Sequence, residues 1–276
     1  EALVQSKEQL KGTVRFLFQP AEEGHHGAKF MLEDGAIEGV EEVYGLHLWN
    51  YQPFGTIGVQ SGPIMACSDK FEISIKGVGG HGAAPQGTVD AIVVAAHLIT
   101  ALQTIVSRNT NPLESTVVTI GQINGGDNFN IITDQVRLRG TARAYTSENQ
   151  ALIISQMNQI IEGIASTFGA KISLEYQKGY PVTVNAVGPT EKTRIAAEKI
   201  AGEGVISPYL SMGGEDFSYF ANEVPSCYFF IGSAPTDREP MSVPHHCSHF
   251  DIDERALLVG ASVYTQIALD CLGTAS

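Results

Sequence analysis

Hydrophobic and polar positions alternate with two different periods along the chain, and these periods predict strands and amphipathic helices in both end regions. Apolar runs typical of buried strands lie at residues 13–18, 43–48, 56–59 and 227–232. Helical periodicity predicts helices over about 26–34, 190–202 and 254–271. The last of these places Leu257, Ala261, Tyr264, Ala268 and Cys271 on its inward stripe. This mixture predicts an α/β domain built from both ends of the chain.

The middle of the chain, from about residue 68 to residue 177, has a different order of elements. Strands are predicted at residues 71–75, 115–123, 136–144 and 171–176. Helices are predicted over 88–107, with Ile92, Ala96, Ile99, Leu102 and Val106 on one face, and from Ser147 onward, with Gln150 completing a capping box. The order β-α-β-β-α-β is that of the ferredoxin-like, split-βαβ arrangement. We therefore expect an α/β domain at residues 1–66 and 179–276, interrupted by an inserted domain at 67–178.

Composition and charge narrow the classes of partner. With 43% hydrophobic and 17% charged residues, the 276-residue chain has the composition of an ordinary globular protein. A formal net charge of −13 argues against nucleic acid and anionic membranes, because both call for basic patches. No run of 18 apolar residues is present, so we expect no membrane span. Four widely spaced cysteines and no signal-peptide pattern favour free thiols in a cytoplasmic protein.

An acidic loop follows the first predicted strand. The run QPAEEGHHG occupies residues 19–27, and Pro20 should end strand pairing just before Glu22 and Glu23. Ligands of open α/β sheets lie at the carboxyl ends of the strands. Neighbouring side chains diverge at such a turn, so one carboxylate can hold a cation while the other transfers a proton. An acidic surface loop that opens a helix is the alternative, because Glu is favourable in a helix's first turn.

Histidines provide the second candidate group. His47 lies near the end of the predicted strand at 43–48, and three more histidines lie in the loop at residues 245–249. Carboxylate oxygen and imidazole nitrogen together suit zinc, manganese or cobalt. A structural histidine at a strand end and a solvated histidine loop are the alternatives. The acidic loop, His47 and the histidine loop all fall in the predicted α/β domain, and their combination favours a metal site.

Five motifs in this order resemble one known family. They are QPAEEG at residues 19–24, GLH at 45–47, GGHGAAP at 79–85, GGEDF at 213–217, and His246 followed by FDIDE at 250–254. Together they are similar to the aminoacylase/carboxypeptidase family of di-metal hydrolases. Within it, the chain most resembles the amidohydrolases that include hippurate hydrolase and the indole-acetyl-amino-acid hydrolases. The resemblance implies a metal-bearing α/β domain interrupted by a ferredoxin-like dimerisation or lid domain.

The resemblance implies roles for the residues of the α/β domain. Glu22 matches the family's general base, and Glu23, His47 and His246 match metal ligands. Gly213 and Gly214 match a place where backbone amides approach the substrate. His245 and His249 match no ligand position, and we interpret them as supporting or solvated residues.

The resemblance also implies roles for three residues of the inserted domain. His81 matches the histidine that reaches the partner subunit's active site and polarises the scissile carbonyl. Asn130 and Arg143 match residues that hold the substrate near its carboxylate. These matches imply a homodimer formed through the inserted domain.

Two departures from the family pattern bear on metal and substrate. The remaining ligands, a Cys and a His of a His-x-Cys-Gly-His-Asp motif, would lie upstream of Glu1, where residues 1–4 look like the inside of a helix. We therefore expect an N-terminal part to be missing, two divalent ions in the complete protein, and fewer in residues 1–276 alone. Gln86 stands where the family often has His, which leaves the substrate preference open.

The resemblance implies a metal-dependent amidohydrolase that cleaves the amide bond of N-acyl or N-aroyl amino acids. A dipeptidase or carboxypeptidase using the same site is one alternative. A catalytically incomplete fragment that acts only as a binding or dimerisation module is the other.

Overall fold

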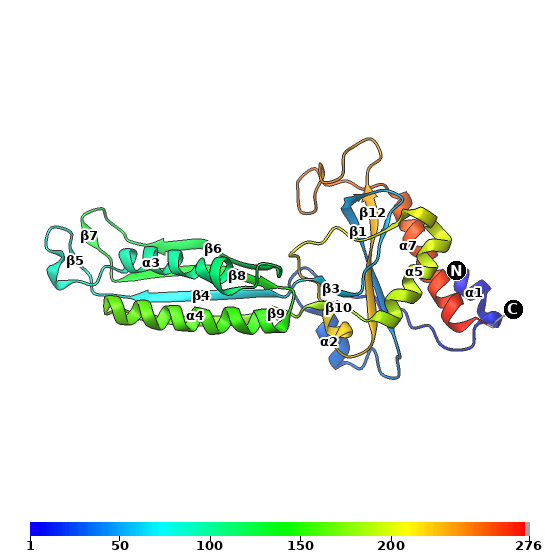
Figure 1. Ribbon diagram of the computed structural model, residues 1–276, viewed down its shortest axis with the longest axis horizontal. Coiled ribbons are helices and arrows are strands. Elements are labelled where there is room, and N and C mark those ends of the chain that lie inside the picture. The colour runs from blue at the N-terminus through cyan, green and yellow to red at the C-terminus, as the bar shows by residue number, and fades with distance from the viewer. Residues whose placement is uncertain (274–276) are drawn as a thin grey trace. The chain divides into compact units, whose positions relative to one another are not determined.

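The computed structural model describes residues 1–273 and divides into two compact units (Figure 1). Unit 1 comprises Glu1–Ile64, Thr183–Ser211 and Asp216–Ser276, and unit 2 comprises Met65–Val182 and Met212–Glu215. The last short segment was expected in the α/β domain. It belongs to unit 2 because the Ala66 amide donates to the Gly213 carbonyl at 2.8 Å and Gly214 packs directly on Ser68.

Unit 1 is built on a mixed four-stranded sheet. The strands are β1 (Val43–Pro53), β12 (Ser226–Ala234), β2 (Ile57–Gly58) and β11 (Val205–Ile206), in that order across the sheet. β1 and β12 run parallel, and β12 is antiparallel to β2. Helices α5 (Val187–Ala201) and α7 (Arg255–Leu272) cover one face (Figure 1). All nine residues of β12 are buried, as expected for a strand covered on both faces.

Smaller elements complete unit 1. They are the helices α1 (Ala2–Gln5), α2 (Gly27–Glu33) and α6 (Ser218–Ala221), the 3₁₀ helices at Lys7–Gln9 and Gly202–Gly204, and β3 (Gly62–Met65) paired with β10 (Thr183–Asn185). The predicted helices near 26–34, 190–202 and 254–271 are thus confirmed, as are the strands near 43–48, 56–59 and 227–232.

Two predictions for unit 1 are wrong. Residues 13–18 form no strand, and Phe18 is 87% exposed, because no other described segment pairs with this run and takes up its backbone hydrogen bonds. The buried stripe of α7 consists of Ala256, Gly260, Val263 and Ile267. It is displaced by one position from the predicted stripe, and Leu257 is exposed.

Unit 2 contains a four-stranded antiparallel sheet in the order β6-β8-β4-β9. The elements follow one another as β4 (Ser68–Lys76), α3 (Ala91–Leu102), β6 (Thr116–Gly125), β8 (Gln135–Ala144), α4 (Ser147–Phe168) and β9 (Lys171–Tyr180). A short ladder of β5 (Gly80–His81) with β7 (Ile131–Ile132), a 3₁₀ helix at Pro85–Gly87 and a π-helical turn at Ile105–Asn109 were not predicted.

The two helices of unit 2 pack on one face of the sheet. Alternate β4 residues Phe71, Ile73 and Ile75 share a core with Leu98 of α3 and Met157 of α4. The buried face of α3 is formed by Ala91, Val94, Ala95, Leu98 and Leu102. The predicted face is therefore wrong at Ile92, Ala96 and Val106, which are exposed, whereas Leu102 is buried and Ile99 is half-buried against the core. Because α3 is apolar almost all round, periodicity could not select the side that the sheet covers.

Two further details of unit 2 differ from the sequence expectations. The N-cap of α4 is Thr146, whose hydroxyl accepts from the Asn149 amide, so Ser147 and Gln150 form no capping box. Gln150 instead donates to the buried carboxylate of Asp69 at 2.7 Å. The segment Ala91–Asn109 is long and apolar enough to cross a membrane by length and composition, but five residues of α3 within it are buried in the core of unit 2.

Candidate active site

The acidic loop is a compact turn that leads directly into α2. Its glutamates differ in environment, because Glu22 is half-buried and Glu23 is exposed. The loop folds tightly over Gly27, where a Cβ atom would lie 1.7 Å from the Pro20 carbonyl oxygen. A glycine is therefore required at this position, and the close contact sets the path of the chain between residues 20 and 27.

Asp216 anchors this loop from a distant part of the sequence. Its buried side chain accepts the Ala28 amide at 2.8 Å through Oδ2, and the Gln19 side chain donates to Oδ1. The Ala28 amide is one of the unpaired donors at the start of α2, so Asp216 caps this helix. Carboxylate oxygens of Glu22 and Asp216 lie within 4.8 Å of each other. Asp216 was not predicted as a site residue, although it stands in the GGEDF motif.

The hydrogen bond of His47 leaves its outer ring nitrogen with a lone pair. It lies inside β1, which extends to Pro53, and not near the end of a strand as predicted. Its Nδ1 lies 2.6 Å from the Leu48 carbonyl oxygen. Because a carbonyl can only accept, Nδ1 carries the proton and Nε2 is left with a lone pair. Metal-ligating histidines have this arrangement, with the second nitrogen bonded to an oxygen acceptor.

The histidine loop reaches His47 through His245. The two rings meet edge to face with centroids 5.2 Å apart, and the His245 ring also lies 5.1 Å from the Trp49 ring. Burial, followed by the neighbouring His47 and His246, lowers the pKa of His245 to about 4. His245 is therefore neutral at pH 7 and adds no positive charge where a cation would bind. His246 is exposed, with a left-handed backbone at φ 63°.

The structure brings together only part of the expected metal site. His47 and the loop bearing His246 are neighbours through His245, whereas His249 is exposed. Within residues 1–273, no group of ligand atoms closer than 4.8 Å combines Glu23, His47 and His246. These residues nevertheless supply one carboxylate and two imidazoles, a donor set that suits a divalent transition metal.

At one end of unit 2, His81 and Asn130 are neighbours. His81 of β5 pairs with Ile131 of β7, and the Gly82 amide donates to the Asn130 carbonyl at 2.9 Å. The exposed His81 ring accepts the Ala83 amide through Nδ1 at 3.0 Å. Since a backbone amide can only donate, the neutral ring carries its proton on Nε2. His81 thus presents a hydrogen-bond donor to solvent.

Arg143 lies near the other end of the same sheet. It is close to the end of β8, and eight residues at a rise of 3.4 Å place it about 27 Å from Gln135 at the strand's start. Its Nε donates to the Thr141 hydroxyl at 3.2 Å. Burial lowers the pKa of Arg143, while neighbouring Cys67 and Asp69 act in the opposite direction.

Gly213 and Gly214 have a packing role in unit 2. A Cβ atom at Gly214 would lie 2.6 Å from the Cβ of Ser68, and the Gly213 carbonyl accepts the Ala66 amide. These contacts explain glycine at position 214 without reference to a substrate.

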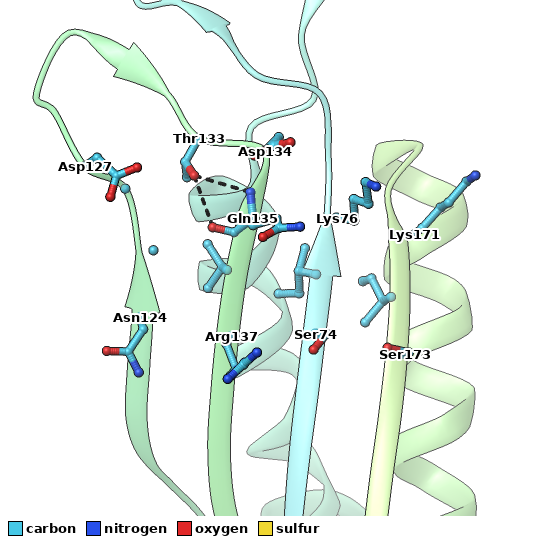
Figure 2. Close-up of a pocket in the computed structure, with 15 residues that line it drawn as sticks. Ser74, Lys76, Asn124, Asp127, Thr133, Asp134, Gln135, Arg137, Lys171 and Ser173 are labelled. Atoms are coloured by element: carbon cyan, nitrogen blue, oxygen red, sulfur yellow. Dashed lines mark hydrogen bonds between the residues drawn. The ribbon is translucent and has the colours of Figure 1, made fainter.

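A pocket of about 710 Å³ lies over the strand ends of unit 2 (Figure 2). Side chains from four strands and their connections line it, including Lys76, Arg137, Lys171, Asp127 and Asp134. None of the candidate site residues lines this pocket, so it does not mark the predicted active site.

Comparisons with known proteins place the chain in one family. The chain matches the sequence profile of peptidase family M20/M25/M40 over residues 1–270. It is 40% identical over 258 residues to the N-acetyl-L-cysteine deacetylase of Bacillus subtilis (strain 168), covering 93% of this chain and 60% of the relative. It is 35% identical over 271 residues to the IAA-amino acid hydrolase ILR1-like 4 of Arabidopsis thaliana, covering 96% and 61%.

A solved structure shows the same fold. The Bacillus subtilis YXEP protein, described as a dinuclear metal-binding peptidase of the M20 family, matches with a TM-score of 0.82 at 33% identity. The match covers 98% of this chain and 68% of that one. The chain therefore spans about three fifths to two thirds of the length of these three relatives.

Proposed function

The chain belongs to peptidase family M20/M25/M40, and on this premise we propose that it acts in metal-dependent hydrolysis of the amide bond of N-acyl or N-aroyl amino acids. The tautomer of His47 carries the proposal. Its Nδ1 donates to the Leu48 carbonyl, so its Nε2 keeps a lone pair that can bind a metal. The similarity to a deacetylase of N-acetyl-L-cysteine and to an amino-acid conjugate hydrolase supports this substrate class.

Glu23, His47 and His246 would hold the metal. A structure described as dinuclear supports two ions, and the donor set suits zinc, manganese or cobalt. When bound, such an ion lowers the pKa of its water toward neutrality and polarises a carbonyl. His245 supports this role because its neutral ring stands beside His47 without opposing a cation.

Glu22 is proposed as the proton carrier. Its carboxylate would accept a proton from the attacking water and deliver it to the leaving amine, so one group serves both half-reactions. Asp216 keeps this loop in place through Ala28 and Gln19, which supports a fixed position for Glu22. Backbone amides at Gly213 and Gly214 would approach the substrate.

We further propose that unit 2 is a ferredoxin-like lid through which two chains form a homodimer. His81, with its proton on Nε2, would donate to the carbonyl oxygen under attack. His81 and Asn130 lie at one end of unit 2, and Arg143 lies about 27 Å along β8 from the strand's other end. An N-acyl amino acid is far shorter than this distance. One substrate could therefore contact both groups only if they came from different subunits.

The test is hydrolysis of a substrate panel by the protein supplied with zinc, manganese or cobalt. N-acetyl and N-benzoyl amino acids are expected to be cleaved, and a chelator should abolish the cleavage. A peptidase using the same site is the alternative that the description of the YXEP protein favours. Cleavage of dipeptides alone would establish that alternative. Rates equal to background with every metal and every substrate would leave only a binding role.

A further inference from the structure

The loop that carries His246 has little regular structure of its own. It connects the end of β12 at Ala234 to the start of α7 at Arg255 and contains only turns. Unstructured loops of this length within compact domains are uncommon and are usually functional. Because the loop forms no ladder, contacts with the rest of unit 1 must fix where His246 stands.

One buried side chain supplies those contacts on both sides of His246. Asn50 is 0% exposed. Its Nδ2 donates to the Val243 carbonyl at 3.0 Å and to the Asp251 carbonyl at 2.6 Å. Its Oδ1 accepts the Ser233 hydroxyl at 2.6 Å. Both amide hydrogens are therefore used to tie together two loop positions that flank His246.

The backbone of Asn50 binds the same loop. Its amide donates to His245 Nε2 at 3.3 Å, and its carbonyl accepts the Met241 amide at 3.0 Å. These groups are free to do so because the pairing of β1 with β12 becomes irregular between Trp49 and Pro53. Asn50 thus binds the loop at four residues, three positions after the candidate ligand His47 on the same strand.

We infer that Asn50 is a positioning residue that holds the 241–253 loop so that His246 stands beside His47 for metal binding. The inference deepens the proposed function and rests on it, because it assumes that these histidines are ligands. Asn50 itself need not touch metal or substrate. The two N–H groups of its side-chain amide face two carbonyl oxygens. No other side chain of this size can donate two hydrogen bonds in those directions.

Asn185 offers a matched control within unit 1. It is also buried, its Nδ2 donates to the Gln60 and Tyr228 carbonyls at 2.8 and 2.7 Å, and its Oδ1 accepts the Tyr228 amide at 2.7 Å. Asn185→Asp and Asn50→Asp both replace two donors by an acceptor that faces two carbonyl oxygens. Only Asn50 contacts the histidine loop, so the two variants separate general destabilisation from loss of the metal site.

The experiment measures zinc affinity by competition with a chromophoric chelator, and hydrogen–deuterium exchange of the metal-free protein. We expect Asn50→Asp to weaken zinc binding about 10- to 100-fold, the cost typical of lost groups around metal ligands. Exchange over residues 241–253 should become faster in Asn50→Asp and remain unchanged in Asn185→Asp. Ser233→Ala, which keeps both Nδ2 contacts, should fold and show a smaller effect in the same direction.

Several outcomes would overturn the inference. Wild-type zinc affinity in Asn50→Asp would do so, as would equal losses of affinity in Asn50→Asp and Asn185→Asp. If the wild-type protein binds no zinc, manganese or cobalt, the proposed function fails. Exchange still decides the positioning role in that case, because unchanged protection of residues 241–253 in Asn50→Asp and Ser233→Ala would refute it.

Discussion

At the scale of single residues, the neighbouring glutamates of the acidic loop are expected to do different work. Glu22 is half-buried near Asp216, whereas Glu23 is exposed. Glu22→Gln preserves shape but removes proton transfer, so kcat should fall by about 10²–10⁴ or more with metal content retained. Glu23→Gln should lower metal affinity instead. Steady-state kinetics with elemental analysis of both variants checks this, and metal loss confined to Glu22→Gln would reverse the assignment.

Two buried thiols are expected to make the free energy of unfolding depend on pH. Burial raises the pKa of Cys67 and of Cys227 to about 11, from an ordinary 9.0. The unfolded thiols lose their protons first, so between about pH 9 and pH 11 the unfolded state binds fewer protons and the free energy of unfolding falls. Urea titrations of the wild type and of a Cys67→Ala, Cys227→Ala double variant measure this contribution. Equal pH dependence in both proteins would contradict it.

Thiol labelling tests the same pair independently. The thiolate is the reactive form, and a pKa of about 11 leaves roughly one thiolate in a thousand at pH 8. In the native protein, Cys271, which is exposed, should react with a disulfide reagent long before Cys67 or Cys227. Rapid native labelling of either buried thiol, identified by mass spectrometry, would show that it is accessible.

At the scale of elements, the start of α2 depends on close packing and not on helix propensity. Gly27→Ala would place a Cβ atom 1.7 Å from the Pro20 carbonyl, so the acidic loop must move. We expect a loss of about 1–3 kcal/mol in the free energy of unfolding, as for other overpacked sites. Gly163 lies in the interior of α4, is exposed, and has nothing within 4 Å of its built Cβ.

Gly163→Ala is therefore the matched control for the Gly27 prediction. It should stabilise the protein by roughly 0.4–1 kcal/mol, because alanine reduces the freedom of the unfolded chain without strain in the helix. Urea unfolding of both variants gives the comparison. Equal effects of the two substitutions would mean that the acidic loop accommodates a methyl group without cost.

At the scale of the whole molecule, the separation of His81 from Arg143 within unit 2 predicts a shared active site. Glu22→Gln and His81→Ala are each expected to be inactive. When the two variants exchange subunits at random, a trans role for His81 gives every heterodimer one complete site. The mixture should then recover about a quarter of wild-type activity, as random two-fold pairing requires. Activity that stays at the level of the separate variants, with exchange verified by mass, would show that His81 does not act in the partner's site.

Local periodicity in the sequence was enough to predict most elements of this protein. Alternation identified β4, β6, β8 and β9, because a side-chain period of two is written directly into each strand. The motifs around Glu22, His47 and His246 also identified the candidate chemical groups, because residue type and order can be read directly from the sequence. Periodicity and motifs both depend only on residues that lie close together in the chain.

The sides that elements bury, and the polar contacts that hold the site, were decided only by the tertiary structure. α3 is apolar almost all round, and α7 buries a stripe one position away from the predicted one, so each helix face was selected by its neighbours. Asp216 caps α2 across 188 positions of sequence, and Asn50 reaches Val243 across 193. A buried polar group must find a partner, but nothing in its local sequence states where that partner lies. The sequence therefore determined the elements and the candidate chemical groups, whereas long-range packing and hydrogen bonding determined how those groups are held.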